Sequence, residues 1–212
     1  NGDYAALTPD IDRLATNGAR FTSAYVSGPV CCPSRAGLLT GRYQQRFGHE
    51  FTIQGTGANG TPFGLSLQEK TIGNRLQAAG YATGWFGKSH LGFQPEYHPL
   101  QRGFDEFFGF LAAMHSYLRE TGGRGNAILR GTEPAPFTHT TDDFGREAVS
   151  FIERHRAKPW FVYLAFNAVH GPLESTEKYL ARFTATEVPK RRTFSAMLSA
   201  IAVAISCVAM PA

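Results

Sequence analysis

Trp160-Phe161-Val162-Tyr163-Leu164-Ala165-Phe166 is an unbroken apolar run that directly follows Pro159. Such a run is typical of a strand buried on both faces, as in a parallel sheet. A helical pattern precedes it over residues 141–155, with one apolar side formed by Phe144, Ala148, Phe151 and Ile152. A further strand is predicted over residues 81–86. Strands that alternate with helices predict an α/β fold, with a mostly parallel sheet flanked by helices.

The remaining elements are predicted from caps and breakers. Thr8-Pro9 starts a helix that Gly18 ends. Residues 19–26 are predicted to form a strand, and a short helix is predicted from Pro33 to Gly41. Ser66-Leu67-Gln68-Glu69 has the pattern of a capping box and should open a helix that ends at Gly80. Residues 92–137, rich in Gly, Pro and aromatic residues, are predicted to be an elaborated loop region.

Length and composition limit the class of protein. The 212 residues suffice for one sizeable domain or for a large piece of a bigger one, and no linker divides them. With 42% hydrophobic and 18% charged residues, the chain is not intrinsically disordered. The net charge of +4 is spread along the chain, so it favours an anionic small substrate over nucleic acid. Three cysteines cannot form a disulfide framework, so the cysteine content does not indicate whether the protein works in an oxidising or a reducing compartment.

The two ends carry weaker signals. No initiator Met and no signal-peptide pattern is present, so we expect the chain to start inside a longer product. The last 20 residues are uncharged and follow Lys190-Arg191-Arg192, as in a membrane anchor. We favour a buried core helix and expect no membrane association. The helical spacing of its large apolar residues supports that interpretation: Phe194, Met197, Leu198, Ile201, Ile205 and Val208.

Three segments follow predicted strands, at the edge of an α/β sheet where ligands bind. In the first, Cys31 lies just before a helix start, where free N–H groups can hold an anion, and Arg35 adds a cation. A buried pair of thiols beside a structural Arg is an equal alternative. In the second, Lys88 and His90 are two residues apart, which suits an oxyanion and a proton transfer. The third contains His170. Taken singly, Lys88, His90 and His170 are more often structural.

Together the three segments closely resemble the sulfatase family. Cys31 to Gly41 matches the signature Cys-x-Pro-Ser-Arg-x-x-x-Leu-Thr-Gly in full, and Gly80 to His90 matches Gly-Tyr-x-Thr-x-x-x-Gly-Lys-x-His. Residues 8–26, 103–107 and 159–183 are also similar, so the likeness spans nearly the whole chain. The resemblance implies the alkaline-phosphatase-like α/β fold and a sulfuric ester hydrolase.

The resemblance also implies a mechanism. A separate maturation enzyme, which reads Cys-x-Pro-x-Arg, would oxidise Cys31 to formylglycine, and one hydroxyl of the hydrated aldehyde would attack the sulfur of a sulfate ester. Arg35 would hold the diol, Lys88 would bind the sulfate, and His90 would assist the diol hydroxyl. His170 would help to protonate the leaving oxygen. A Ca²⁺ ion, with formylglycine 31 among its ligands, would polarise the sulfate.

Other implications concern substrate and location. His115 is a candidate for lining the pocket of a small sulfated sugar or aryl sulfate, although a structural role is the commoner one for such a residue. Family resemblance favours a periplasmic or secreted protein.

The chain departs from the family in its metal ligands. The family's Asp-Asp pair before Thr8 and its Asp-Asn pair after the His170 segment are not in this sequence, which leaves Cys31 as the one expected ligand present. We therefore expect residues 1–212 to be the N-terminal portion of a sulfatase catalytic domain, without the C-terminal subdomain and with an incomplete metal site. A formylglycine-dependent phosphoester hydrolase and a non-catalytic sulfatase fragment are the alternatives.

Overall fold

The computed structural model describes residues 8–52, 63–186 and 188–209 and contains one five-stranded sheet of order β4-β3-β2-β1-β5. The central strand β1 (Ala82–Lys88) runs parallel to β2 (Glu106–Phe110) on one side and to β5 (Trp160–Ala165) on the other. Two short strands, β3 (Leu129–Arg130) and β4 (Glu133–Pro134), add antiparallel pairs beyond β2. The predicted α/β fold with a mostly parallel sheet is confirmed.

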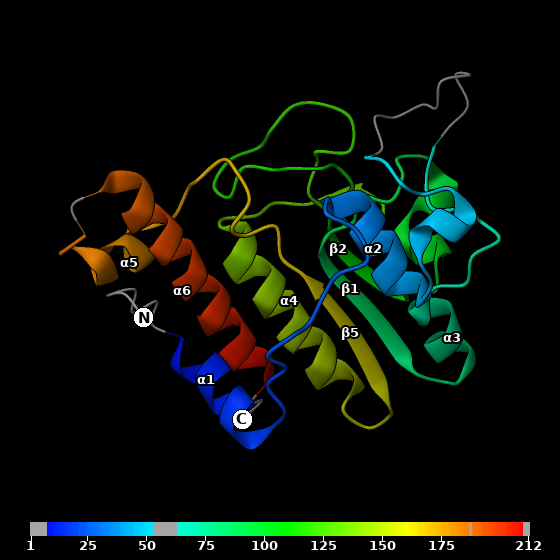
Figure 1. Ribbon diagram of the computed structural model, residues 1–212, viewed down its shortest axis with the longest axis horizontal. Coiled ribbons are helices and arrows are strands. Elements are labelled where there is room, and N and C mark those ends of the chain that lie inside the picture. Colours follow the sequence, from blue (N-terminus) through cyan, green and yellow to red (C-terminus); the bar gives the residue numbers. More distant parts are fainter. Residues whose placement is uncertain (1–7, 53–62, 187, 210–212) are drawn as a thin grey trace.

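Helices cover both faces of this sheet (Figure 1). On one side lie α2 (Cys31–Thr40) and α3 (Ile72–Ala78), and on the other lies α4 (Thr140–His155). Beyond α4 lie α6 (Pro189–Ala209), α1 (Pro9–Asn17) and the short α5 (Glu177–Leu180). Single 3₁₀ turns occupy Gln44–Phe47, Pro95–Tyr97, Pro99–Gln101 and Ala181–Phe183.

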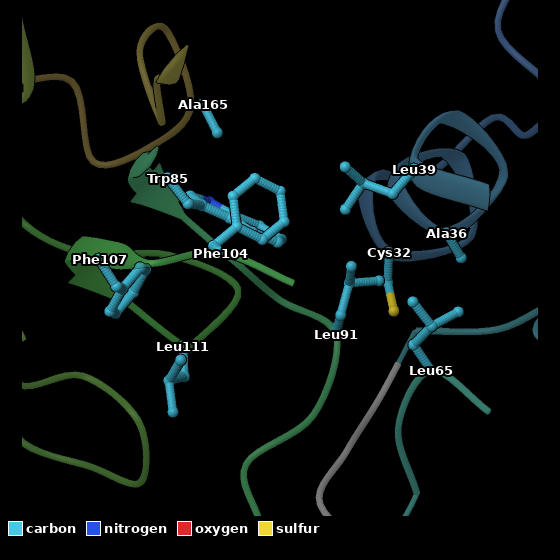
Figure 2. Close-up of a cluster of buried hydrophobic side chains, with 10 residues drawn as sticks. All are labelled: Cys32, Ala36, Leu39, Leu65, Trp85, Leu91, Phe104, Phe107, Leu111 and Ala165. Carbon is cyan, nitrogen blue, oxygen red and sulfur yellow. The ribbon is translucent and has the colours of Figure 1, made fainter. Parts of the chain in front are cut away.

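The alternation of side chains along β1 divides the core into two clusters. Trp85 faces α2 and packs edge-on against Phe104 with ring centroids 4.9 Å apart, beside Cys32 and Leu39 of the helix (Figure 2). Its neighbour Phe86 points to the opposite face, where it joins the aromatic side chains of α4. Both clusters are buried, so each face of the sheet is fixed by apolar packing.

Glycine brings three strands unusually close just before Lys88. A Cβ on Gly109 of β2 would lie 1.9 Å from the carbonyl oxygen of Gly87. Gly87 itself has φ +117°, and a Cβ there would lie 2.3 Å from the carbonyl oxygen of Ala165. Only residues without a side chain fit these contacts, so the end of β1 is held in a fixed position between its two neighbours.

The strand predicted over residues 19–26 is wrong. This segment forms an irregular connection between α1 and α2, with no ladder to another described strand (Figure 1). Phe21 and Tyr25 are 78% and 92% exposed. The residues have strand-forming composition, but a strand needs a partner edge, and none of the described strands provides one.

The capping box predicted at Ser66–Glu69 is also wrong. Helix α3 begins later, at Ile72, and Thr71 and Asn74 form the reciprocal cap at its start. The carboxylate of Glu69 instead accepts two hydrogen bonds from Arg42, at 2.5 and 2.6 Å. A side chain committed to a distant Arg cannot cap a helix, so the cap moves to the next suitable pair.

The region predicted as loop over residues 92–137 contains β2, β3 and β4, of which β2 is an interior strand of the sheet. Conversely, β5 is less buried than predicted. From Trp160 to Leu164 its side chains are exposed or half-buried, because β1 is the only strand that pairs with it in the described part of the chain.

Helix α6 packs against α4 and α5, and most of its buried residues are small. Of the predicted apolar stripe, Met197 is 1% exposed, whereas Phe194 is 40% exposed. A Cβ on Gly145 of α4 would lie 2.8 Å from that of Ala204, so the two helices approach too closely for large side chains. By length and composition, α6 is the one described helix that could cross a membrane, and a third of the tested window is buried inside the protein.

Candidate active site

The first turn of α2 places Cys31 at the carboxyl end of β1. Val30 is extended, and Cys31 is the first helical residue, in a position where backbone N–H groups have no helical partner. The Cys31 Sγ lies 3.2 Å from Nδ1 of His90. Lys88 hydrogen-bonds the same thiol. Two of the three predicted segments therefore meet at one sulfur atom.

His90 is completely buried and has φ 58°, which turns the chain sharply after β1. Burial and, to a smaller extent, the positive charges of Lys88 and Arg35 lower the pKa of His90 to about 3. The imidazole is therefore neutral at neutral pH. Its Nε2 is buried and has no hydrogen-bond partner among the described residues, so it is available to a group that enters the site.

The site contains a buried cation, Lys88, and a half-buried one, Arg35. Lys88 is 2% exposed, and burial lowers its pKa, as does the charge of Arg35. Arg35, one turn into α2, donates a 2.8 Å hydrogen bond to the backbone carbonyl of Lys88 and another to the hydroxyl of Tyr163. Sheltered positive charge of this kind favours an anion as the missing partner.

Cys32 forms a second and separate pair with a histidine. Its Sγ lies 3.0 Å from Nε2 of His49, and both residues are buried. The other ring nitrogen of His49 is engaged by the backbone of Gly64, so Nε2 is the acceptor for the thiol proton. Burial lowers the pKa of His49 to about 4, and the ring stacks on Phe63. The adjacent cysteines therefore occupy different environments.

His170 follows β5 in an exposed loop. Its Nδ1 lies 2.8 Å from the carbonyl oxygen of Gly171, so this nitrogen carries the hydrogen and Nε2 remains available. The charge of His170 contributes to lowering the pKa of His90. The third predicted segment thus lies within electrostatic range of the other two.

His115 is buried in the core, and its backbone carbonyl accepts a 3.4 Å hydrogen bond from the side chain of Asn167. His115 is 1% exposed and packs between Phe110 and Phe137, with ring centroids 5.2 and 5.3 Å away. Its Nδ1 lies 2.5 Å from the carbonyl oxygen of Ser116. The burial leaves a substrate little access to the ring, and a substrate-binding role for His115 stays a prediction.

The side chains around Cys31 do not fit a calcium ion. Ca²⁺ takes six to eight oxygen ligands, whereas this site offers a thiol, imidazoles and two cations. Within residues 8–52, 63–186 and 188–209, no group of three or more His, Cys, Asp or Glu side chains is placed to hold a metal ion. No step of the chemistry is therefore assigned to a metal here.

Sequence reasoning missed Tyr163 and His49. Tyr163 lies within the apolar run of β5 and was interpreted there as a core residue. Its hydroxyl, the one polar group in that run, and its position in the second half of the strand could have indicated a place at the site. His49 belongs to no motif, and only the folded chain brings it to Cys32.

Comparison with known proteins gives a consistent result. The family model described as Sulfatase matches residues 1–205. N-acetylgalactosamine-6-sulfatase of Sus scrofa is 36% identical over 200 residues, covering 84% of this chain and 38% of that protein. Arylsulfatase J of Mus musculus is 32% identical over 210 residues, covering 93% of this chain and 34% of that protein. The chain thus spans less than two fifths of these relatives.

Solved structures agree. The crystal structure of Ps i-CgsB in complex with k-i-k-neocarrahexaose superposes with a TM-score of 0.90 at 33% identity, covering 98% of this chain and 49% of that one. The PsFucS1 sulfatase from Pseudoalteromonas sp. superposes with a TM-score of 0.73 at 27% identity, covering 98% and 47%.

Proposed function

Because this chain belongs to the sulfatase family, we propose that it is the N-terminal portion of a sulfatase catalytic domain that hydrolyses a sulfate monoester through a formylglycine derived from Cys31. The single observation that carries the proposal is the meeting of His90 and Lys88 at the Cys31 sulfur, with Arg35 beside them. A nucleophile, a sheltered cation and a neutral imidazole are the parts that attack on an anionic ester requires.

The charges favour an anionic ester group. Lys88 and Arg35 both lie near Cys31, and the charges that act most strongly on the Lys88 pKa among the described residues are those of Arg35 and the two cysteines. Burying the Lys88 cation beside Arg35 is costly, and a bound sulfate group offsets that cost. The negative charge that develops on the sulfate oxygens is then stabilised by groups already fixed in place.

Each side chain has a distinct role in the proposal. When Cys31 has been converted, formylglycine would supply a hydrated aldehyde, of which one hydroxyl would attack the sulfur and expel the alcohol, and loss of the proton of the other would release sulfate and restore the aldehyde. The neutral imidazole of His90 orients the attacking hydroxyl by hydrogen bonding. It accepts the proton of this hydroxyl only while the anionic sulfate ester is bound. Arg35 holds the diol, and Lys88 binds the sulfate. His170, whose Nδ1 hydrogen is held by the Gly171 carbonyl, would give a proton to the leaving oxygen from Nε2 when the ring is in its imidazolium form.

The proposal extends to substrate, partner and location. Two relatives bear the names N-acetylgalactosamine-6-sulfatase and Arylsulfatase J, so we expect a small sulfated sugar or aryl sulfate. Cys31-Cys32-Pro33-Ser34-Arg35 contains the Cys-x-Pro-x-Arg sequence that a formylglycine-generating maturation enzyme would read. We expect a periplasmic or secreted location.

The experiment combines mass spectrometry with matched substrates. The chain is produced in a host that contains the maturation enzyme, and the tryptic peptide that spans Cys31 is weighed. Rates are then compared on 4-nitrophenyl sulfate and 4-nitrophenyl phosphate. We expect conversion of Cys31 and faster cleavage of the sulfate, both lost in Cys31→Ala and kept in Cys32→Ala. An unmodified thiol throughout overturns the mechanism, and faster cleavage of the phosphate assigns the site to phosphoester hydrolysis.

A calcium titration tests the non-catalytic alternative. The side chains around Cys31 do not suit Ca²⁺, and the described residues contain no other group placed to hold a metal ion, so we expect no tight binding of Ca²⁺ by residues 1–212 alone. A chain that is converted at Cys31 but cleaves neither ester is a non-catalytic portion of a sulfatase. Tight calcium binding by these 212 residues contradicts the expectation of an incomplete metal site.

A further inference from the structure

The loop that carries His170 is held by one buried hydroxyl. Tyr117 is 0% exposed, and its hydroxyl lies 2.9 Å from the carbonyl oxygen of Asn167 and 2.8 Å from that of His170. The amide of His170 also donates to the carbonyl of Asn167, at 2.8 Å. The tyrosine therefore contacts both ends of a tight turn between β5 and the imidazole.

Tyr117 is itself fixed from the far side of the same loop. Its backbone amide donates to Oε2 of Glu174 at 2.9 Å, and the Ser116 hydroxyl donates to the same oxygen at 2.5 Å. Arg119 pairs with the other carboxylate oxygen at 3.1 Å. Segments 116–119 and 167–174 are thus joined at two places, one at each end of the His170 loop.

The ring of His170 depends on the backbone that Tyr117 holds. The imidazole hydrogen-bonds the carbonyl of the next residue, Gly171, so its orientation follows the backbone at positions 170 and 171. His170 is an exposed residue. Whatever holds the His170 carbonyl therefore limits where Nε2 can point.

We propose that Tyr117 is a positioning residue for His170: its hydroxyl, bonded to the carbonyls of Asn167 and His170, keeps the loop in the conformation that presents the imidazole to the active site. The proposal rests on the proposed role of His170 as the proton donor. Burial raises the pKa of Tyr117, so the hydroxyl keeps its proton and remains a donor. One proton shared between two carbonyls suits a clamp better than a proton relay.

The test is Tyr117→Phe with Tyr179→Phe as the matched control. Tyr179 is also 0% exposed, and its hydroxyl donates to Asp142, away from the His170 loop. Hydrogen exchange over residues 167–171 is measured by mass spectrometry in the full chain. Losing the clamp should accelerate exchange there about tenfold, the equivalent of one hydrogen bond, and the control should leave it unchanged. Equal exchange in the two variants overturns the proposal.

Kinetics supply the second measurement. With 4-nitrophenyl sulfate, Tyr117→Phe should lower kcat about tenfold and leave KM within about twofold, because binding groups stay in place while the donor is misaligned. A proportional change in both constants, matched by Tyr179→Phe, indicates a merely structural role and overturns the proposal. If Tyr117→Phe does not fold, Glu174→Gln, which loosens the support of Tyr117, should raise exchange over 167–171 about threefold; unchanged exchange in Glu174→Gln overturns the proposal.

Failure of the proposed function is distinguishable from failure of this inference. Absence of sulfate cleavage by the unmutated chain contradicts the proposed function, yet the exchange measurement still decides whether Tyr117 holds the loop. Faster exchange in Tyr117→Phe with an unchanged kcat shows that the clamp does not position a catalytic group, and overturns the inference while the proposed function stands.

Discussion

The guanidinium of Arg35 donates a 2.8 Å hydrogen bond to the backbone carbonyl oxygen of Lys88. This contact joins the first turn of α2 to the end of β1, 53 residues away in the sequence. It also brings the half-buried charge of Arg35 close to the buried charge of Lys88, and both charges lower the pKa of His90. This hydrogen bond therefore both joins α2 to β1 and places the Arg35 charge next to Lys88.

Replacing Arg35 should damage both properties. Arg35→Ala removes a fixed cation and the shorter of the two hydrogen bonds to the Lys88 carbonyl, which leaves that from the Trp85 indole, so we expect kcat/KM for an aryl sulfate to fall by about 100-fold or more. The free energy of unfolding should fall by about 1–2 kcal/mol. Arg35→Lys keeps the charge without the planar fork and should lose roughly tenfold in rate. Arg154→Ala, at an exposed ion pair with Glu106, is the control and should change both quantities little.

Alkylation should separate the two adjacent cysteines. In the unconverted chain, Cys31 is half-buried and Cys207 exposed, whereas Cys32 is 0% exposed and hydrogen-bonded to His49. We expect iodoacetamide to label Cys31 and Cys207 at least about tenfold faster than Cys32. Peptide mass spectrometry gives the three rates, and Cys207→Ser confirms the assignment. Labelling of Cys32 as fast as Cys31 in the folded chain contradicts the buried Cys32–His49 pair.

Acid should weaken the fold through His49. Burial lowers the pKa of His49 to about 4 from 6.5, so the unfolded chain binds a proton there before the folded chain does. The contribution of neutral His49 to the free energy of unfolding is complete above about pH 7. It is lost as pH falls through 6.5 toward 4, by roughly 3 kcal/mol in total. Urea unfolding at pH 7.5 and 4.5 measures it. The pH dependence should be smaller in His49→Gln; an equal dependence in both chains would show that His49 is not responsible.

Adding one methyl group at Gly109 should disrupt the sheet. The new Cβ would lie 1.9 Å from the carbonyl oxygen of Gly87, and backbone cannot give way as a flexible side chain can. We expect Gly109→Ala to lower the free energy of unfolding by about 3 kcal/mol or more. Gly122→Ala, where the added group meets nothing within 4 Å, is the control and should stay within about 0.5 kcal/mol. Similar unfolding midpoints for the two variants would contradict the close contact.

The sequence was sufficient for elements whose signals are local. The helix from Thr8-Pro9 to Gly18 and the strand that leads to Lys88 were both predicted, because caps, breakers and apolar runs lie within the segments themselves. The strand over residues 19–26 was wrong because strand composition does not supply a partner. Strand β2 was missed because Gly109 and the nearby glycines resemble a loop until Gly87 is placed opposite.

In the candidate site, too, residues within local motifs could be predicted, and residues that act through distant contacts could not. Cys31, Lys88 and His90 could be named in advance because they lie in two ordered signatures, and the structure brings them together. Tyr117 and His49 could not, because a hydroxyl that holds a distant carbonyl and an imidazole that holds a buried thiol leave no pattern in the sequence. Such contacts exist only once the chain is folded.

Cys31 and Cys32 begin α2, and successive residues of an α-helix point about 100° apart. The angle at which the chain enters the helix therefore decides which sulfur meets His90 and which meets His49. Inserting a single residue between Cys32 and Pro33 should move Cys32 into the position that Cys31 now holds beside His90, and the new residue should face His49. Cys31 and Cys32 have the same side chain. Their positions around the helix axis decide which of the two faces the active site.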